Sequence, residues 1–232
     1  MTTSERDDMW IRGLLLLVLT GVNANAAPPD ERYYMTLFGA QSSPPITSKT
    51  HTWATFVRTR VTPDGEVPVA VDTVSWMPAT LRIHPFAVRR ETGVNLSLDA
   101  TFAWVASVGS HASYWGPYEI DGDRYAEVLA RKAELESGTV KYRAIGALTF
   151  KQEVSNCGQS FAHASASDVG KYLYPTPSPG ETGTSVLARR YLEVGALRGG
   201  GATHPWLLPA VGADRFPAVE RRPGERIPRF FR

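Results

Sequence analysis

Apolar and polar residues alternate along the first half of the chain, in segments rich in Thr, Val, Trp and Phe. This pattern predicts β-strands over Tyr33–Phe38, His51–Val61 and Val67–Met77, with Leu81–Phe86 as a further candidate. The Pro-Asp-Gly sequence at 63–65 is a strong turn signal that joins the second strand to the third. We therefore expect an antiparallel sheet built around one long hairpin.

Helical spacing of apolar residues replaces this alternation in the second half. Asp121 or Asp123 can cap one helix, and Ser97 or Asp99 another. The order of strands, helices, one more strand and a last set of helices predicts the α+β class. The elements expected there are a helix over 100–106, a helix between 121 and 137, a strand over 139–145, a helix from 157 to about 167 and a helix over 184–192.

The amino terminus has the pattern of a secretory signal peptide. Arg12 precedes an apolar run that is too short to span a bilayer, and Ala24-Asn25-Ala26 forms a small-x-small cleavage pattern. We therefore expect residues 1–26 to be removed and the exported protein to begin at Ala27, in a periplasmic or extracellular location, with no stable membrane span. Acidic residues before Met9 leave open that translation begins there.

The remaining sequence indicates one domain over residues 27–212, which is long enough to bury a substantial core. Residues 213–232 are rich in Arg and Pro, and we expect them to form a solvated tail rather than a nucleic-acid-binding arm. The formal net charge of +2 indicates no particular partner, and we expect a monomer. Metal-ligand spacing, phosphate-loop and dinucleotide patterns are missing from the sequence, so no metal and no cofactor are expected.

Cys157 is the only cysteine of the chain, so it has no partner for an intramolecular disulfide. It stands where an irregular stretch gives way to a helix-compatible run. A thiol at the start of a helix faces unpaired backbone N–H groups, which favour the thiolate. A lone cysteine is also often a small buried apolar residue, so the position alone leaves both interpretations open.

A thiol nucleophile needs an imidazole within hydrogen-bond reach and a polar group that orients the imidazole. Of the five histidines, His84 precedes a proline, His204 lies in the Pro/Gly-rich end, and His163 is more than a helical turn past Cys157. His51, at the start of a predicted strand, and His111, in a predicted loop, remain. A strand end at the edge of a core is where a base can face a cleft, and we therefore select His51.

The order of these residues resembles a known superfamily. Histidine on an early strand, a following antiparallel strand and a late Asn156-Cys157 resemble the circularly permuted branch of the NlpC-type papain-like superfamily, which includes lecithin:retinol acyltransferase relatives. The stretches 51–58, 73–78 and 115–120 also look like a group of exported bacterial proteins with this order. The resemblance implies a permuted papain-like fold with the cysteine at a helix N-terminus. Gly158-Gln159 replaces the Glu-His of the acyltransferase relatives, which makes acyl transfer to lipid the less favoured reaction.

The resemblance also implies an orienting polar residue on the strand after His51. With residues 64 and 65 at the turn centre, pairing places Ser75–Pro78 opposite His51–Ala54. Ser75 is the residue we select, and Asp72 is the alternative if the register slips by one.

We therefore expect an exported cysteine hydrolase or transferase that acts on an amide or ester bond. Its nucleophile would be Cys157, its base His51 and its orienting residue Ser75. Trp115 and Trp53 would lie beside the substrate. The resemblance implies that this substrate is a cell-wall peptide or another amide. The alternative is a non-catalytic secreted binding module of the same fold, with a groove lined by Trp53, Trp76, Trp115 and Tyr118.

Overall fold

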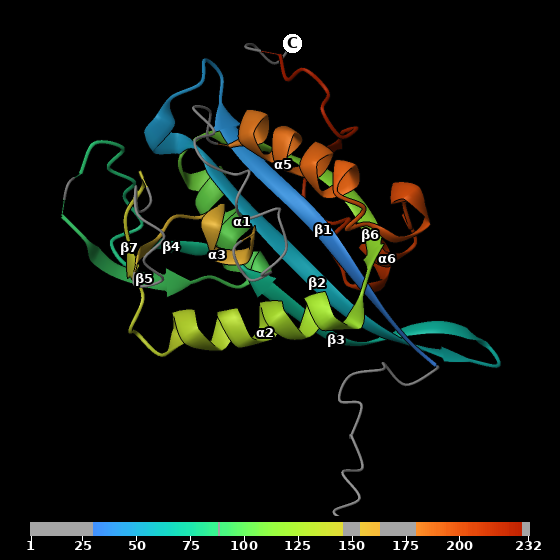
Figure 1. The fold of residues 1–232 in the computed structure, drawn as a ribbon. Coiled ribbons are helices and arrows are strands. Elements are labelled where there is room, and N and C mark those ends of the chain that lie inside the picture. The colour runs from blue at the N-terminus through green and yellow to red at the C-terminus, as the bar shows by residue number, and fades with distance from the viewer. Residues whose placement is uncertain (1–29, 88, 146–153, 163–179, 229–232) are drawn as a thin grey trace, which may run out of the picture.

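Two β-sheets, connected by the chain at Ser75, organise the fold (Figure 1). The structure is a computed structural model that describes residues 30–87, 89–145, 154–162 and 180–228; the predicted signal peptide and cleavage site lie outside these residues. In the described part, the larger sheet has the strand order β3-β2-β1-β6-β9 and the smaller sheet the order β4-β5-β7-β8. The strands are β1 (Glu31–Ser42), β2 (His51–Thr62), β3 (Gly65–Val74), β4 (Trp76–Pro78), β5 (Glu91–Asn95), β6 (Ser110–Ile120), β7 (Lys141–Tyr142), β8 (Val154–Ser155) and β9 (Ala218–Glu220).

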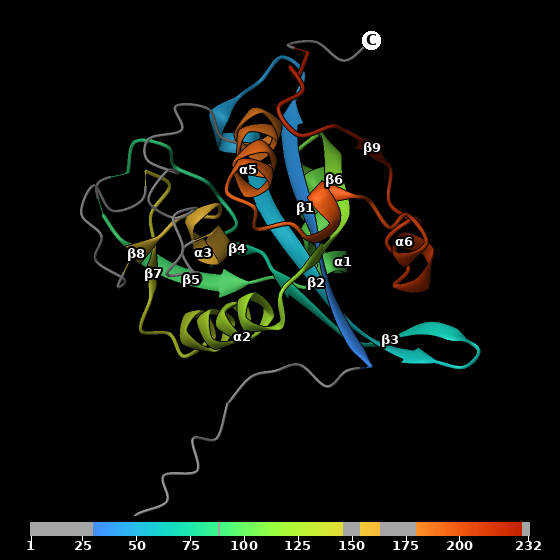
Figure 2. The ribbon, with the colours of Figure 1, turned by 45° about the vertical axis from the view of Figure 1, so that its right-hand side comes forward.

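Helices cover both faces of the larger sheet, because alternate residues of β1 point into different core clusters. Met35 and Leu37 pack with apolar side chains of α2, α3 and α5, whereas Phe38 and Ala40 pack with those of α1. Figure 2 shows α2, α3 and α5 on one side of β1 and α1 on the other. The helices are α1 (Leu98–Ser107), α2 (Gly122–Glu136), α3 (Gln159–Ala162), α5 (Glu181–Glu193) and α6 (Leu207–Ala210), with 3-10 turns at Thr47–Lys49 and Arg198–Gly201. The prediction of an α+β class is confirmed.

The predicted long hairpin is present as β2 and β3, with a different register. Thr62 pairs with Gly65, so the turn is centred on residues 63 and 64 rather than 64 and 65; a bulge between Arg58 and Thr59 offsets part of this shift and leaves Ala54 opposite Val74, one residue from the predicted pairing. After Val74 the chain leaves β2 and enters the smaller sheet through β4. The start of β2 therefore has an edge that β3 does not cover.

Four strands, β5, β6, β8 and β9, were not predicted, and the candidate strand over 81–86 is a loop. The Gly116-Pro117 sequence in β6 indicates a turn, yet β6 is a central strand. Its pairing with β1 steps from Met35 opposite Tyr118 to Leu37 opposite Trp115, so the proline lies in a register shift. A proline there removes no ladder hydrogen bond, which is why the strand tolerates it.

The C-terminal segment is ordered as far as the structure describes it, so the expectation of a solvated tail is wrong for residues 215–228. β9 pairs in parallel with β6, and the Phe216 ring stacks on Phe102 with 4.2 Å between centroids. Trp115 Nε1 donates a hydrogen bond to the Arg222 carbonyl, and Ile227 is buried in the main core cluster. The apolar residues between the arginines make these contacts. The high content of arginine and proline in the segment gave no indication that it docks on the core.

No helix in the described ranges combines the length and the apolar character that crossing a membrane requires.

We expect truncation after Asp214 to destabilise the protein, because it removes β9, the Phe216 ring and the buried Ile227. A loss of at least about 2 kcal/mol in the free energy of unfolding corresponds to a fall of roughly 4–8 °C in Tm for a chain of this size. Thermal unfolding followed by circular dichroism measures this. Truncation after Pro228 keeps all of these contacts and is the control; an equal Tm for the two truncated proteins would show that the segment adds no stability.

Candidate functional site

His51 and Ser75 lie together where the two sheets are connected. Both residues are fully buried, and His51 Nε2 is 2.8 Å from Ser75 Oγ. Ser75 lies just beyond the last paired residue of β3, yet its side chain still reaches His51. Asp72, the alternative, lies opposite Phe56 and binds the Tyr125 hydroxyl at 3.0 Å. The structure therefore brings Ser75 to His51, and it directs Asp72 to helix α2.

Aromatic side chains enclose the imidazole of His51. The Trp53 ring stacks on it with 5.4 Å between centroids and an interplanar angle of 14°, and Trp104 meets it edge-on at 5.7 Å. Burial lowers the pKa of His51 to about 3, so the imidazole is neutral at neutral pH. Its Nδ1 atom is buried and has no hydrogen-bond partner among the described residues. Of the two ring nitrogens, the structure therefore pairs Nε2 with Ser75 and leaves Nδ1 unpaired within the described part of the chain.

The backbone of Ser75 is fixed by β5. Its N–H donates to Asn95 Oδ1 at 2.8 Å, and its carbonyl accepts from the Leu96 N–H at 2.9 Å. Asn95 in turn donates from Nδ2 to the Thr73 carbonyl and to Glu136 of α2. The hydroxyl that meets His51 is therefore held by two sheets and a helix, which limits its freedom to move.

Cys157 lies in the turn before α3, and side-chain hydrogen bonds fix that turn. Asn156 Oδ1 accepts from the Gln159 N–H at 2.8 Å, while Gln159 Oε1 accepts from the Asn156 N–H at 3.3 Å. This is the reciprocal pattern of a capping box. Ser160 Oγ also donates to the Cys157 carbonyl. The residues on both sides of Cys157 thus set its backbone conformation.

The thiol of Cys157 meets the start of β2 beside His51. Burial raises the pKa of the Cys157 thiol, and this effect outweighs the lowering of the pKa by the nearby backbone N–H groups of Thr52, Gly158 and Cys157 itself. The expectation of an environment that favours the thiolate is therefore wrong: the N–H groups are present, but burial dominates. Thr52 follows His51 directly, so the contact brings Cys157 to the same end of β2.

The aromatic residues proposed for substrate binding belong to the core. Trp53 and Trp115 are fully buried, as are Trp76 and Tyr118 at 1% exposure. Trp53 stacks between His51 and Phe38, and Trp115 packs beneath the C-terminal segment. None of these four side chains offers an exposed surface to a ligand, so the predicted aromatic groove is replaced by core packing.

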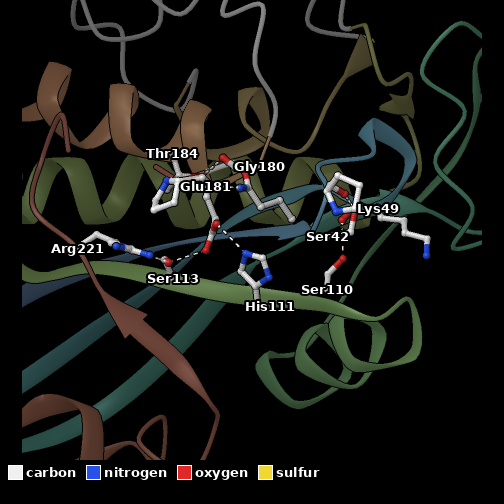
Figure 3. Close-up of polar contacts among 12 residues, drawn as sticks. Ser42, Lys49, Ser110, His111, Ser113, Gly180, Glu181, Thr184 and Arg221 are labelled. Carbon is white, nitrogen blue, oxygen red and sulfur yellow. Dashed lines mark hydrogen bonds and ion pairs between the residues drawn. The ribbon is translucent and has the colours of Figure 1, made fainter. Parts of the chain in front are cut away.

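A second polar cluster, which sequence reasoning missed, joins α5 to the larger sheet (Figure 3). Glu181, fully buried in the first turn of α5, accepts from Ser113 Oγ at 2.5 Å and lies 3.1 Å from His111 Nε2. Arg221 Nε donates to the same Ser113 hydroxyl at 3.2 Å. A glutamate near a helix start is typical of a solvated residue, so no local signal distinguishes this one. His111, the second candidate base, belongs to this cluster.

The first turn of α5 also contacts β2 next to the site. Thr184 Oγ1 lies 3.0 Å from Thr52 Oγ1, and the Thr184 hydroxyl also contacts the Gly180 carbonyl at 2.9 Å. Gly39 of β1 makes this approach possible, because a Cβ atom there would lie 2.6 Å from Thr184 Oγ1. Helix α5 therefore fixes the strand segment whose N–H meets Cys157.

The remaining histidines lie elsewhere or outside the described residues. His84 is exposed in the loop before β5, and His204 packs edge-on against Tyr34 at 4.9 Å. His163 lies outside the described residues. Within the described ranges, no three His, Cys, Asp or Glu side chains group closely enough to hold a metal ion.

Comparison of the chain with protein-family models, with curated proteins and with solved structures finds no match. The interpretation of the site therefore depends on its own geometry and on the resemblance in residue order.

The buried imidazole should make stability depend on pH. The folded-state pKa of about 3 is below the ordinary value of 6.5, so the unfolded chain binds the proton first as the pH falls. His51 therefore lowers the free energy of unfolding as the pH falls from about 6.5 toward 3, and has little effect on it at higher pH. Between pH 7 and pH 5 the expected decrease is about 2 kcal/mol. Urea unfolding at both pH values should show that His51→Gln lacks this part of the decrease. An equal decrease in both proteins would contradict a neutral, buried His51.

The raised pKa of Cys157 should make its alkylation slow at neutral pH. The thiolate is the reactive species, so iodoacetamide should modify Cys157 at pH 7 more slowly than free N-acetylcysteine, whose thiol has a pKa of about 8.5. The rate should still be rising with pH above that value. The same protein unfolded in urea is the control for access and should react at the rate of a free thiol. Fast labelling of the folded protein at pH 6 would contradict a neutral thiol.

Proposed function

We propose that the protein is an exported thiol hydrolase or transferase that acts on an amide or ester bond. One observation carries the proposal: the Cys157 sulfur contacts the backbone N–H of Thr52, and the neighbouring His51 binds Ser75 through Nε2 while its Nδ1 has no partner among the described residues. An imidazole oriented through one nitrogen, with a thiol beside its strand, resembles the arrangement that thiol catalysis needs; Nδ1 and the Cys157 sulfur form no hydrogen bond in this structure, so the substrate complex must bring them together.

The pKa directions decide how the reaction would begin. With burial keeping both the thiol and the imidazole neutral, proton transfer accompanies attack rather than preceding it. The sulfur of Cys157 forms a bond to the substrate carbonyl carbon as its proton passes to Nδ1 of His51. The imidazolium then protonates the leaving amine or alcohol, and an acyl-enzyme remains. A buried imidazolium is a strong acid, which favours this second transfer.

The second half of the reaction uses the same groups. Water attacks the acyl carbon, gives a proton to the neutral His51, and releases the acid as the proton returns to the Cys157 sulfur. Another nucleophile in place of water makes the reaction a transfer. The backbone N–H groups of Thr52 and Cys157 lower the pKa of the Cys157 thiol, and they are the donors we assign to the oxyanion.

We further propose that the fold is the permuted papain-like one, with Cys157 at the amino end of a helix. The order of His51 on β2, Ser75 after β3 and Cys157 before α3 supports this assignment, as does the reciprocal Asn156–Gln159 capping. The substrate class we assign, a cell-wall peptide or another amide, and the exported location come from the resemblance and from the signal-peptide pattern.

A non-catalytic member of the same fold is the competing function. The observation that favours it is the burial of His51, whose pKa of about 3 disfavours the imidazolium that catalysis must form. The two functions differ in one measurable respect: catalysis requires that His51 accelerate acylation of Cys157.

We expect p-nitrophenyl acetate to acylate Cys157, with release of p-nitrophenol and an acetyl group mapped to this residue by mass spectrometry. Cys157→Ala should abolish the labelling, and His51→Ala should slow it by roughly 100-fold or more, because a general base contributes about 10²–10⁴. Ser75→Ala should slow it by about tenfold, since the imidazole is still present but less well oriented.

His84→Ala is the matched control, because His84 is exposed and lies in a loop away from the site. It should react like the unchanged protein. Because any accessible thiol reacts slowly with this ester, the comparison with His51→Ala decides the outcome. Equal acylation rates in these two variants would refute the catalytic function and leave the binding module.

A further inference from the structure

The loop between β4 and β5, residues 79–90, presents one apolar side chain almost entirely to water. Phe86 is 88% exposed, whereas the other exposed large apolar side chains of the described part lie between 38% and 48%. The same loop buries Ile83, three residues earlier, in the core. Partly exposed apolar residues are common on protein surfaces, but full exposure of an aromatic ring forgoes the burial that stabilises such side chains.

The charge of this loop has one sign. Residues 79–90 contain Arg82, Arg89 and Arg90, all of them exposed, and no Asp or Glu. Within the described part of the chain, neither Arg82 nor Arg89 forms an ion pair. Glu91, the first acidic residue after the loop, accepts from Thr80 Oγ1 at 3.1 Å. The loop therefore combines an exposed aromatic ring with positive charge that its own residues do not balance.

The core fixes the backbone of the loop. Leu81 has a left-handed backbone with φ 56°, which a leucine adopts only where its surroundings enforce it. Its N–H donates to the Pro78 carbonyl at 2.8 Å, and its carbonyl accepts from Trp104 Nε1 of α1 at 3.0 Å. Ile83 packs in the same core cluster as Trp104. The fold thus holds both sides of this short segment while Phe86 faces solvent.

The two properties together select the chemistry of a partner. A free phosphate would bind the arginines but would leave the Phe86 ring in water, and a purely apolar surface would leave the arginines without a counter-charge. Stable protein interfaces bury roughly 800 Å² on each partner, whereas one aromatic ring supplies roughly 200 Å². At a lipid surface, by contrast, a few side chains are enough for reversible binding: aromatic rings enter the headgroup boundary and basic residues meet the phosphates.

We propose that the loop over residues 79–90 docks the protein on an anionic phospholipid surface, with Phe86 in the headgroup boundary and Arg82 and Arg89 on lipid phosphates. This proposal goes beyond the proposed function and does not depend on the chemistry of Cys157. Figure 1 and Figure 2 place this loop and the β2–β3 hairpin at opposite ends of the molecule. Docking through the loop therefore directs the hairpin away from the lipid.

Tryptophan fluorescence tests the docking at single residues. Phe86→Trp and Val67→Trp each place an added indole at an exposed apolar position, the first in the loop and the second in the hairpin. Phosphatidylglycerol with brominated acyl chains quenches an indole that contacts those chains. In vesicles of this lipid the emission of Phe86→Trp should fall by more than that of unchanged protein, while Val67→Trp should behave like unchanged protein. Both variants keep the apolar run at residues 14–22, so any contact of that run with lipid cancels in the comparison.

Vesicle sedimentation tests the role of charge. Arg82→Gln and Arg89→Gln should each lower the affinity for phosphatidylglycerol vesicles about fivefold, because a basic residue near an anionic surface contributes about that factor. Arg60→Gln removes the same charge from the hairpin and is the matched control; it should change the affinity less than about twofold, since salt screens charges at that distance. Vesicles of phosphatidylcholine alone should bind weakly. The substituted side chains are exposed, so circular dichroism should show an unchanged Tm in every variant.

Several results would overturn the proposal. Equal quenching in Phe86→Trp and Val67→Trp would show that the loop is not the part that meets the lipid. Equal affinities of Arg82→Gln, Arg89→Gln and Arg60→Gln would remove the role of the arginines. If glycerol 3-phosphate at millimolar concentration prevents sedimentation with vesicles and the Phe86→Trp indole is not quenched, the arginines bind a phosphate ester and the loop does not dock on lipid.

Discussion

The hydrogen bond between His51 and Ser75 lies at the point where the chain passes from one sheet to the other, and the arrangement of the site depends on it. Because β3 stops pairing with β2 after Val74, the edge at the start of β2 is one that β3 does not cover. The Thr52 N–H on that strand meets a cysteine sulfur instead of another strand. Had β3 continued along β2, the ladder would have occupied the edge and Ser75 would have pointed elsewhere.

The packing that orders the site also sets its electrostatics. Trp53 and Trp104 hold the His51 ring on two sides, and the same enclosure removes the water that would stabilise an imidazolium. Burial also disfavours the charged form of Cys157, because it raises the pKa of the thiol more than the nearby backbone N–H groups lower it. The site therefore has a fixed geometry but no preformed pair of Cys157 thiolate and His51 imidazolium. Any charge that a reaction needs must develop during the reaction itself.

Distant parts of the chain keep this geometry in place. Helix α5 reaches β2 through the Thr184–Thr52 contact, and Glu181 ties the same helix turn to β6 (Figure 3). The segment after Arg215 then covers β6 through β9 and the Arg222 carbonyl. A buried carboxylate such as Glu181 is tolerated because its oxygens meet Ser113 and His111, which satisfy it inside the core.

The sequence by itself determined the features that follow from local rules. The α+β class, the hairpin of β2 and β3, the Ser97 cap and the helix over 122–136 follow from alternation, turn residues and helical spacing, all of which act over a few neighbours. The selection of Ser75 beside His51 also came from local reasoning, namely pairing counted from a turn, although the turn is centred one residue earlier than expected and the register differs by one residue.

Only the tertiary structure decided the environment of each of these residues. Burial is a property of the whole fold, so the neutral state of His51, the raised pKa of Cys157 and the enclosure of Trp53 and Trp115 could not be predicted from their neighbours in sequence. The buried polar contacts of Glu181 and of Thr101 in α1 could not be predicted for the same reason. Each is an ordinary helix residue until a strand from a distant part of the chain places a hydroxyl against it.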